Sequence, residues 1–298
     1  MAEASIPVDL LNPGQVFACI GLVEAADVLL GRVDGIFDWS NPADVRFRLR
    51  APGDTSPIVR VLTFLDRASA SAIAPVDSPS VDAWLASWGP KPTAISRSLG
   101  YPFPDPDKPA MLVCLLSDGE HEIRIDYYGD ATERDNVKFW AGAGGYPGAS
   151  LARDALALVA GRAVSAAHDP FALSAPQSSS FRLDWRRDYI PLSAGFSLNQ
   201  HSNIDPVGFP LVELLGAIGL THARPRRPER RNKLEYVYGI PGRARSGGVP
   251  WLPPTMLRAA LGAAALPFPM RRFRMSLDWP GKEGQARSIT IVTEDTIS

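Results

Sequence analysis

The chain has 298 residues, 45% of them hydrophobic and 21% charged, with a formal net charge of −1. This apolar content is enough for a sizeable core and excludes an intrinsically disordered polymer. Two cysteines cannot build a disulfide framework, which indicates a reducing, cytoplasmic location. The first residues lack the pattern of a signal peptide, and no apolar run reaches the ~20 residues that span a bilayer, so no membrane contact is expected.

The first part of the chain predicts a short strand, a helix, a hairpin of two strands and a second helix. Their expected ranges are 5–10, 12–31, 36–39, 45–50 and 57–66. Asn12 is suited to cap the first helix, and Pro13 is suited to its first turn. The order β-α-β-β-α is the order with which a ferredoxin-like unit begins.

Apolar residues and arginines alternate along the predicted strand 45–50. A strand has a period of two, so its apolar residues should face the helices and its arginines the open face of the sheet. There they could contact the phosphates of a single strand. The arginines are Arg46, Arg48 and Arg50. The alternative is a set of salt bridges to acidic residues across the hairpin, namely Asp34, Asp38 and Asp44.

Proline and serine are abundant in residues 74–110, which predicts an insertion or shaped loop outside the core. Two strands and a helix should follow, at residues 111–116, 122–128 and 149–160. The glycine-rich stretch 142–148 matches a dinucleotide fingerprint poorly. Its glycines suit either a phosphate contact or a tight turn.

The second half again predicts helices mixed with strands. The expected strands and helices lie at 181–185, 209–220, 234–240, 254–265, 272–279 and 287–293. The predicted class is therefore α+β, built from ferredoxin-like units with antiparallel sheets and proline-rich insertions. The predicted halves are residues 1–168 and residues 169–298.

The near-zero net charge conceals an asymmetry. Residues 201–298 carry a net charge of +6, and the other 200 residues carry −7. Most of the cations in the basic part are arginines, whose planar guanidinium suits bidentate phosphate contacts. A solvated surface cluster is the alternative. The further candidate residues for nucleic-acid binding are Arg186, Arg187, Arg224, Arg226, Arg227, Arg230, Arg231, Lys233, Arg243, Arg245, Arg271 and Arg272.

Motifs for catalysis are missing from the sequence. It has no phosphate-binding loop that ends in Gly-Lys-Ser/Thr, no Gly-x-Ser-x-Gly elbow and no paired-histidine helix. Its four histidines are scattered without metal-ligand spacing. We therefore predict no catalytic residue, no metal and no cofactor. His201, in a polar predicted loop, is the one residue that suits a general base, for example in metal-free RNA cleavage.

Three segments resemble a CRISPR-associated family of subtype I-U (also called I-G), a group of RAMP-like effector proteins. They are NPGQVFACIGLVEAADVLL (12–30), KFWAGAGGYPG (138–148) and FRLDWRRDYIPLSAGFSLNQHSNIDPVGFPLVELLGAIGL (181–220). The resemblance extends over most of the chain and supplies no catalytic residue. It implies ferredoxin-like folds of the RRM/RAMP type and a place in a Cascade surveillance complex.

The expected partners are therefore the guide (CRISPR) RNA, the target DNA, other Cascade subunits and a recruited helicase-nuclease, in antiviral defence. Base pairing reads the sequence in such complexes, so this subunit needs backbone contacts and no active site. Two alternatives remain open. One is a metal-free endoribonuclease that processes guide RNA with His201, and the other is a scaffold that contacts only proteins.

Overall fold

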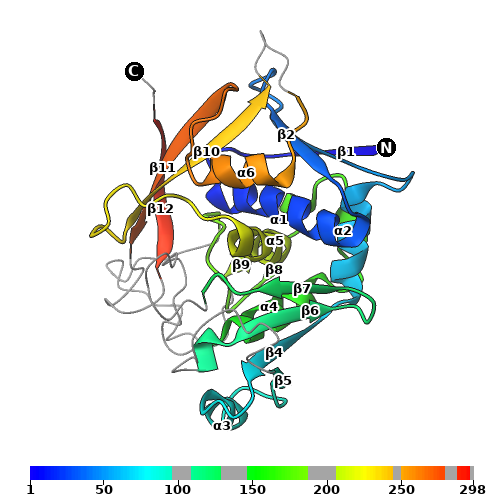
Figure 1. The fold of residues 1–298 in the computed structure, drawn as a ribbon, viewed down its shortest axis with the longest axis vertical. Coiled ribbons are helices and arrows are strands. Elements are labelled where there is room, and N and C mark those ends of the chain that lie inside the picture. The colour runs from blue at the N-terminus through cyan, green and yellow to red at the C-terminus, as the bar shows by residue number, and fades with distance from the viewer. Residues whose placement is uncertain (96–108, 129–145, 187–205, 244–249, 279–286, 296–298) are drawn as a thin grey trace.

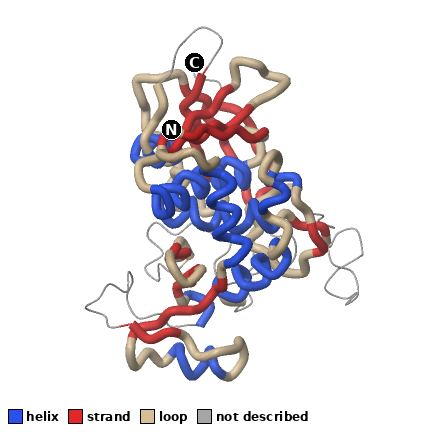
Figure 2. Tube along the Cα trace, turned by 90° about the vertical axis from the view of Figure 1, so that its right-hand side faces the viewer, coloured by secondary structure: helices blue, strands red, loops and turns tan. Residues whose placement is uncertain are grey.

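The computed structural model describes residues 1–95, 109–128, 146–186, 206–243, 250–278 and 287–295. The chain has a mixed α+β fold with three layers. A larger sheet forms the top of Figure 1, helices fill the middle, and a smaller sheet lies at the bottom. Figure 2 shows the same order of layers from the side. This arrangement confirms the predicted α+β class.

The larger sheet has six strands. Their order is β1 (Ala2–Pro7), β3 (Arg46–Ala51), β2 (Asp34–Asp38), β10 (Glu235–Arg243), β11 (Met270–Asp278) and β12 (Ser288–Asp295). Neighbouring strands are antiparallel except β2 and β10, which pair in parallel over only two residues each. β2 and β10 therefore meet at one end and separate, which divides the sheet into two wings (Figure 1).

Helix α6 (Pro254–Leu261) lies between the two wings. A Cβ added to Gly35 on β2 would lie 3.0 Å from Leu257, and one added to Gly239 on β10 would lie 2.7 Å from the carbonyl oxygen of Ala260. The helix therefore contacts both strands where they separate. It ends at Leu261, earlier than the predicted residue 265.

The core is built on two apolar helices, α1 (Pro13–Leu30) and α5 (Pro210–His222). A Cβ on Gly21 would lie 1.8 Å from the carbonyl oxygen of Leu215, and one on Gly219 would lie 2.3 Å from that of Phe17. Only glycine permits this approach of the two backbones. α1 has the length and composition of a membrane-spanning helix, contrary to our expectation of no such run, but 83% of it is buried inside the protein.

The smaller sheet has the strand order β5 (Thr93–Ile95), β4 (Ser69–Pro75), β6 (Val113–Ser117) and β7 (Glu122–Ile125). Helix α4 (Gly148–Val159) packs against β4 and β6 and also against α5 of the core, and helix α2 (Pro57–Arg67) packs against α1 and leads into β4. The remaining described elements are helix α3 (Ser80–Leu85), short 3-10 turns at 109–111, 164–166 and 170–172, and the two-residue strands β8 (Ala175–Pro176) and β9 (Val207–Gly208).

Both predicted halves contribute to the same core. One cluster of buried apolar side chains extends from Ile6 to Ile289, and β2 and β10 pair across the predicted boundary at residue 168. That boundary therefore does not separate two hydrophobic cores.

Most predicted elements are confirmed, including the helices expected at 12–31, 57–66, 149–160 and 209–220 and the closing hairpin. The strand predicted at 181–185 is wrong. Arg182 has a φ of +60°, which interrupts an extended chain, and the segment pairs with none of the described strands.

The described residues of the proline-rich region 74–110 form regular elements. These include the end of β4, helix α3 and β5. Trp84 is 2% exposed and belongs to the core, and its indole Nε1 donates to the carbonyl oxygen of Pro90 at 2.9 Å. The expectation of a region outside the core is therefore wrong for Trp84, because its aromatic area outweighs the local turn composition.

Candidate nucleic-acid interface

The three arginines of β3, which we call the arginine ladder (Arg46, Arg48 and Arg50), alternate with buried residues as predicted. Each of them has a carboxylate partner. Arg50 lies 2.7 Å from Asp34. Arg48 lies 3.3 Å from Glu3 and 3.7 Å from Asp38. Arg46 lies 3.1 Å from Asp44, and its Nε donates to the hydroxyl of Ser5 at 2.8 Å. The ion pairs across the hairpin that the sequence offered as an alternative are therefore present.

An indole ring also covers part of the arginine ladder. The guanidinium groups of Arg48 and Arg50 lie 5.5 and 4.8 Å from the ring centroid of Trp251. Trp251 is fixed there because its neighbour Leu252 exchanges two backbone hydrogen bonds with Gly35 of β2. Three arginines, four carboxylates and this ring form a surface on which each guanidinium already has a partner of opposite charge, and we call it the balanced surface. A phosphate would have to displace these existing partners.

Asp38 shows the electrostatic effect of this arrangement. Burial opposes its ionisation, but hydrogen bonds from the side chain and backbone of Ser40 and the charges of Arg243 and Arg48 outweigh it. The pKa of Asp38 is therefore lowered from its ordinary value. Arg243, another candidate from the sequence, is in this way part of the same balanced surface.

Arg186 is partly exposed but is held by a buried carboxylate. Its guanidinium donates to both carboxylate oxygens of Asp184 and to the carbonyl oxygen of Phe171, and it lies 3.6 Å from the ring centroid of Phe209. The side chain of Asp184 is fully buried. Because Asp184 and Phe171 already occupy the guanidinium, Arg186 offers little to a phosphate.

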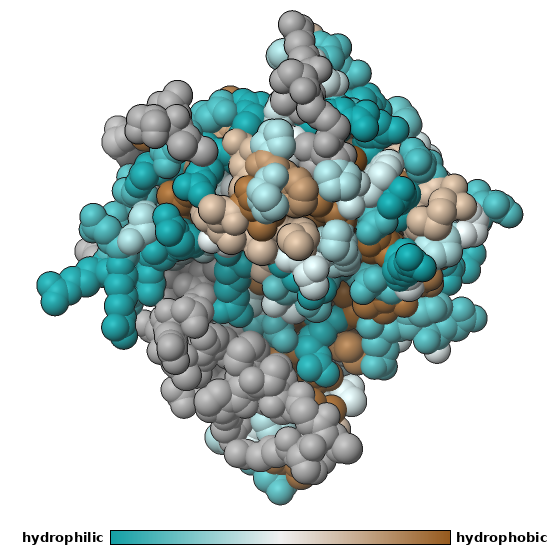
Figure 3. Space-filling view, turned by 45° about the horizontal axis from the view of Figure 1, so that its top comes forward, coloured by the Kyte–Doolittle hydropathy of each residue, from teal (hydrophilic) through white to brown (hydrophobic). Residues whose placement is uncertain are grey.

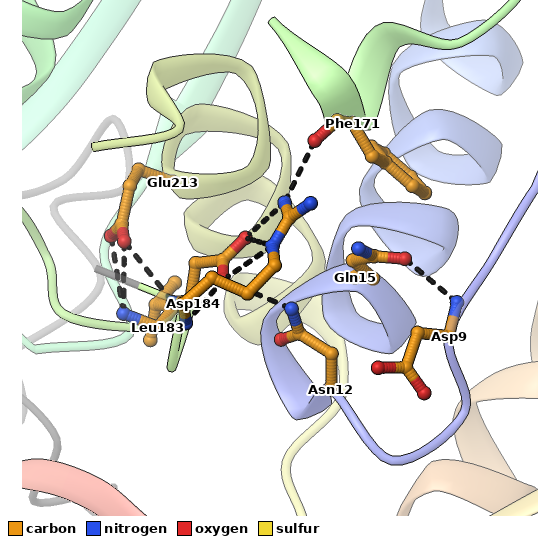
Figure 4. Close-up of polar contacts among 8 residues, drawn as sticks. Asp9, Asn12, Gln15, Phe171, Leu183, Asp184 and Glu213 are labelled. Carbon is orange, nitrogen blue, oxygen red and sulfur yellow. Dashed lines mark hydrogen bonds and ion pairs between the residues drawn. The ribbon is translucent and has the colours of Figure 1, made fainter. Parts of the chain in front are cut away.

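Two further side chains complete this cluster (Figure 4): Glu213, which the sequence did not single out, and Asn12, which it indicated only as a helix cap. The carboxylate of Glu213, 1% exposed, accepts the backbone N–H groups of Leu183 and Asp184 at 3.1–3.2 Å. Asn12 occupies the N-cap position of α1 as predicted, but its side chain makes no capping hydrogen bond and its Nδ2 donates to Asp184 at 2.9 Å. These contacts join the starts of α1 and α5 and explain why 181–185 needs no strand partner.

Arginines of the C-terminal strands are paired as well. Arg271 lies 2.6 Å from Glu294, and Arg274 contacts Glu235 and Asp295. The hydrogen bond from Arg271 lowers the pKa of Glu294 despite the opposing effect of burial. Arg272 is half-buried opposite Gly239. Arg271 and Arg274 therefore stabilise the outer wing of the sheet.

The segment between α5 and β10 differs from all of these. We call residues 224–233 the basic segment; it lies at the left of Figure 1. Arg226, Arg230, Arg231 and Lys233 are exposed, whereas Arg224 and Arg227 are half-buried. In the part of the chain that the structure describes, no carboxylate forms an ion pair with Arg226, Arg230 or Arg231.

The basic segment has a fixed place in the fold. Arg226 exchanges backbone hydrogen bonds of 2.7 and 2.8 Å with Val237 of β10, and Asn232 accepts the N–H of Leu234 at 3.0 Å. Its exposed cations therefore project from an anchored chain. Six of its ten residues are basic, and Glu229 is its one acid.

A groove of about 470 Å³ lies between the start of α1 and the β2–β3 turn. Asp9, Asp44 and Asp169 line it, and its two arginines, Arg186 and Arg271, are the ones already bound by Asp184 and Glu294. The groove is therefore negative overall and disfavours an anionic ligand.

Several candidates lie outside the described residues: Arg187, Arg245, His201 and most of the glycine-rich stretch 142–148. Within the described ranges, no group of His, Cys, Asp and Glu side chains is arranged to hold a metal ion. Both cysteines are buried, and burial raises the pKa of each thiol. Comparison with known proteins finds no matching family model, no matching curated protein and no matching solved structure.

Proposed function

We propose that this chain is a non-catalytic subunit of a type I CRISPR surveillance (Cascade) complex and contacts guide RNA or target DNA. The proposal begins from the three segments that resemble the I-U family. The topology is compatible with it in part, because β1, α1, β2, β3 and α2 occur in the order of a ferredoxin-like unit, and the sheet order β1–β3–β2 is the one such a unit has. β4 departs from that pattern, since it pairs with β5 and β6 in the smaller sheet.

The observation that carries the proposal is the contrast between the basic segment and the other arginines. A phosphate contact needs a guanidinium that is accessible and has no carboxylate to give up. Arg226, Arg230 and Arg231 meet this condition among the described candidates, and the arginine ladder does not. The nucleic-acid backbone should therefore lie along the basic segment.

The experiment that tests this is a salt titration of binding. Single-stranded RNA is titrated with the protein at several salt concentrations, and fluorescence anisotropy gives the affinity. Each phosphate contact on a single strand contributes about −0.7 to the slope of log affinity against log salt. The variant Arg226→Gln, Arg230→Gln, Arg231→Gln should flatten the slope by about 2, which is the share of three contacts.

A matched control replaces three exposed cations elsewhere: Arg32→Gln, Arg67→Gln, Lys91→Gln. It lowers the net charge by the same amount and should leave the slope nearly unchanged. Equal slopes for both variants would mean that only overall charge matters. An unchanged slope in the basic-segment variant would overturn the proposed interface and favour a scaffold that contacts proteins alone.

A further inference from the structure

An apolar strip runs over α6 and the chain on both sides of it. Residues 250–270 contain a single charged side chain, Arg258. That side chain does not oppose apolar contact, because its guanidinium donates to the carboxylate of Glu24 at 2.6 Å and Glu24 is 3% exposed. The strip is therefore electrically neutral over 21 residues.

Much of the strip faces solvent. Met256 is 39% exposed, and the other exposed members are Pro250, Pro253, Thr255, Ala264, Ala265, Pro267 and Pro269. Figure 3 shows apolar residues gathered in the middle of this face with hydrophilic residues around them. A contiguous apolar patch with a polar rim is typical of a protein-docking surface, and single exposed apolar residues are not.

Two arginine-containing parts of the chain border the strip. The carbonyl oxygen of Arg224 lies 3.7 Å from where a Cβ on Gly262 would be, so the basic segment borders one end of α6. On the other side, Arg48 and Arg50 lie against Trp251. The carboxylates near this second side are already paired with the ladder, which leaves the excess positive charge at the basic segment.

We propose that the strip 250–270 is a docking surface for a partner protein that presents apolar side chains framed by aspartate or glutamate. The charge of the rim selects this partner, since acidic side chains complement the basic segment. A second copy of the chain suits the surface less well, because residues 250–270 contain no acidic side chain that could face the basic segment. The proposal extends the proposed function, for a subunit needs a protein-facing surface, but it does not require binding of nucleic acid.

The test uses two synthetic amphipathic helical peptides with the same leucine face, one flanked by glutamates and the other by lysines. The glutamate-flanked peptide should bind the full chain at least about tenfold more tightly than the lysine-flanked one. Met256→Glu should weaken its binding about tenfold or more, since it places a charge in the middle of the apolar contact. Ala265→Glu is a second variant at the other end of the strip and should act in the same direction.

Val164→Glu is the matched control, because Val164 is 38% exposed on a different part of the molecule. It should leave peptide binding unchanged, and all variants are checked for an unchanged melting temperature. Equal binding of the two peptides, or full binding by both strip variants, would overturn the proposal. So would dimerisation of the wild-type chain that Met256→Glu abolishes, since the occupant would then be a second copy. RNA binding by Met256→Glu should stay at the wild-type level, so this surface and the nucleic-acid interface can fail separately.

Discussion

The arginine ladder on β3 and the basic segment contain the same residue type in opposite surroundings. The ladder arginines lie between carboxylates of β1, β2 and the β2–β3 turn and the ring of Trp251. In the basic segment, Arg226, Arg230 and Arg231 have no such partner among the described residues. The number of arginines therefore says less about phosphate binding than the positions of the acids near them.

The difference follows from strand geometry. In a hairpin, residues that pair across the strands lie on the same face, so a run of alternating arginines meets whatever alternates on its neighbours. In the register of β2 and β3, Arg50 lies opposite Asp34 and Arg46 lies opposite Asp38. The basic segment forms a backbone bridge with β10 at Arg226, and near its end Asn232 donates to the carboxylate of Glu235. Among the described residues, no strand faces Arg230 or Arg231 to supply an acid.

Loss of Asp184 should have the largest effect on stability, because Asp184 is the most deeply buried of the described carboxylates that pair with an arginine. Asp184→Ala leaves Arg186 without its carboxylate and Asn12 without its acceptor. We expect the free energy of unfolding to fall by about 2 kcal/mol, because the buried amide of Asn12 loses its acceptor while the partly exposed guanidinium of Arg186 can be solvated. Chemical denaturation measures it. Asp169→Ala, a half-buried acid in no described ion pair, is the control and should change stability by less than about 0.5 kcal/mol.

Charge reversal at Arg48 should have a smaller effect and tests the comparison directly. Arg48→Glu places a carboxylate beside Glu3 and Asp38 and removes the contact with Trp251. The site is about one-third exposed, so water screens the repulsion and we expect a loss of about 1 kcal/mol. RNA affinity should stay within about twofold, well under the tenfold that 1.4 kcal/mol represents. Abolished RNA binding in a folded variant would place the interface on the ladder after all.

The elements with strong local signals were predictable from the sequence. α1 and α5 begin at proline and are largely apolar, and β3 alternates strictly between arginines and buried residues. The same alternation raised both possibilities for the ladder, phosphate contact and ion pairs, because a strand pattern gives the face of a side chain but not what lies opposite it.

The elements that the sequence did not predict depend on tertiary contacts. β4 is made largely of alanine and serine, which have little preference for strands, and it forms because β5 and β6 flank it. The segment 181–185 looks like a strand, but the carboxylate of Glu213 binds its amides from a helix 30 residues further along the chain. No spacing rule connects Glu213, Asp184 and Asn12, so their cluster becomes visible only in the folded protein.

The effect of pH on stability through the ladder should be smaller than the effect of charge reversal at Arg48. The pKa of Asp38 is lowered in the folded protein, so the unfolded chain binds the proton more tightly. The stability that its charge contributes is therefore complete above the ordinary carboxyl pKa of about 4 and is lost as the pH falls through the folded value. Asp38→Asn should cost under about 1 kcal/mol near neutral pH, and the difference from wild type should shrink below about pH 4.

Denaturation at a series of pH values measures this difference. Asparagine keeps an oxygen that can accept the hydrogen bonds of Ser40, so the variant isolates the charge. Asp54→Asn, at an exposed acid in no described ion pair, should show no difference at any pH. A difference that grows on acidification would have the wrong sign and would show that the charge of Asp38 does not stabilise the folded protein.

Neutralising the basic segment should have the smallest effect on stability. Arg226→Gln, Arg230→Gln, Arg231→Gln removes three charges that are exposed and unpaired among the described residues, and it leaves the backbone contact of Arg226 with Val237 intact. The free energy of unfolding should therefore stay within about 0.5 kcal/mol of wild type. Denaturation of the same preparation used for the RNA titration measures it. A loss above about 1 kcal/mol would mean that these side chains pack or pair in the folded chain, and a flattened salt slope would then report damage to the fold. With unchanged stability, the same flattened slope reports the loss of phosphate contacts made by these three side chains.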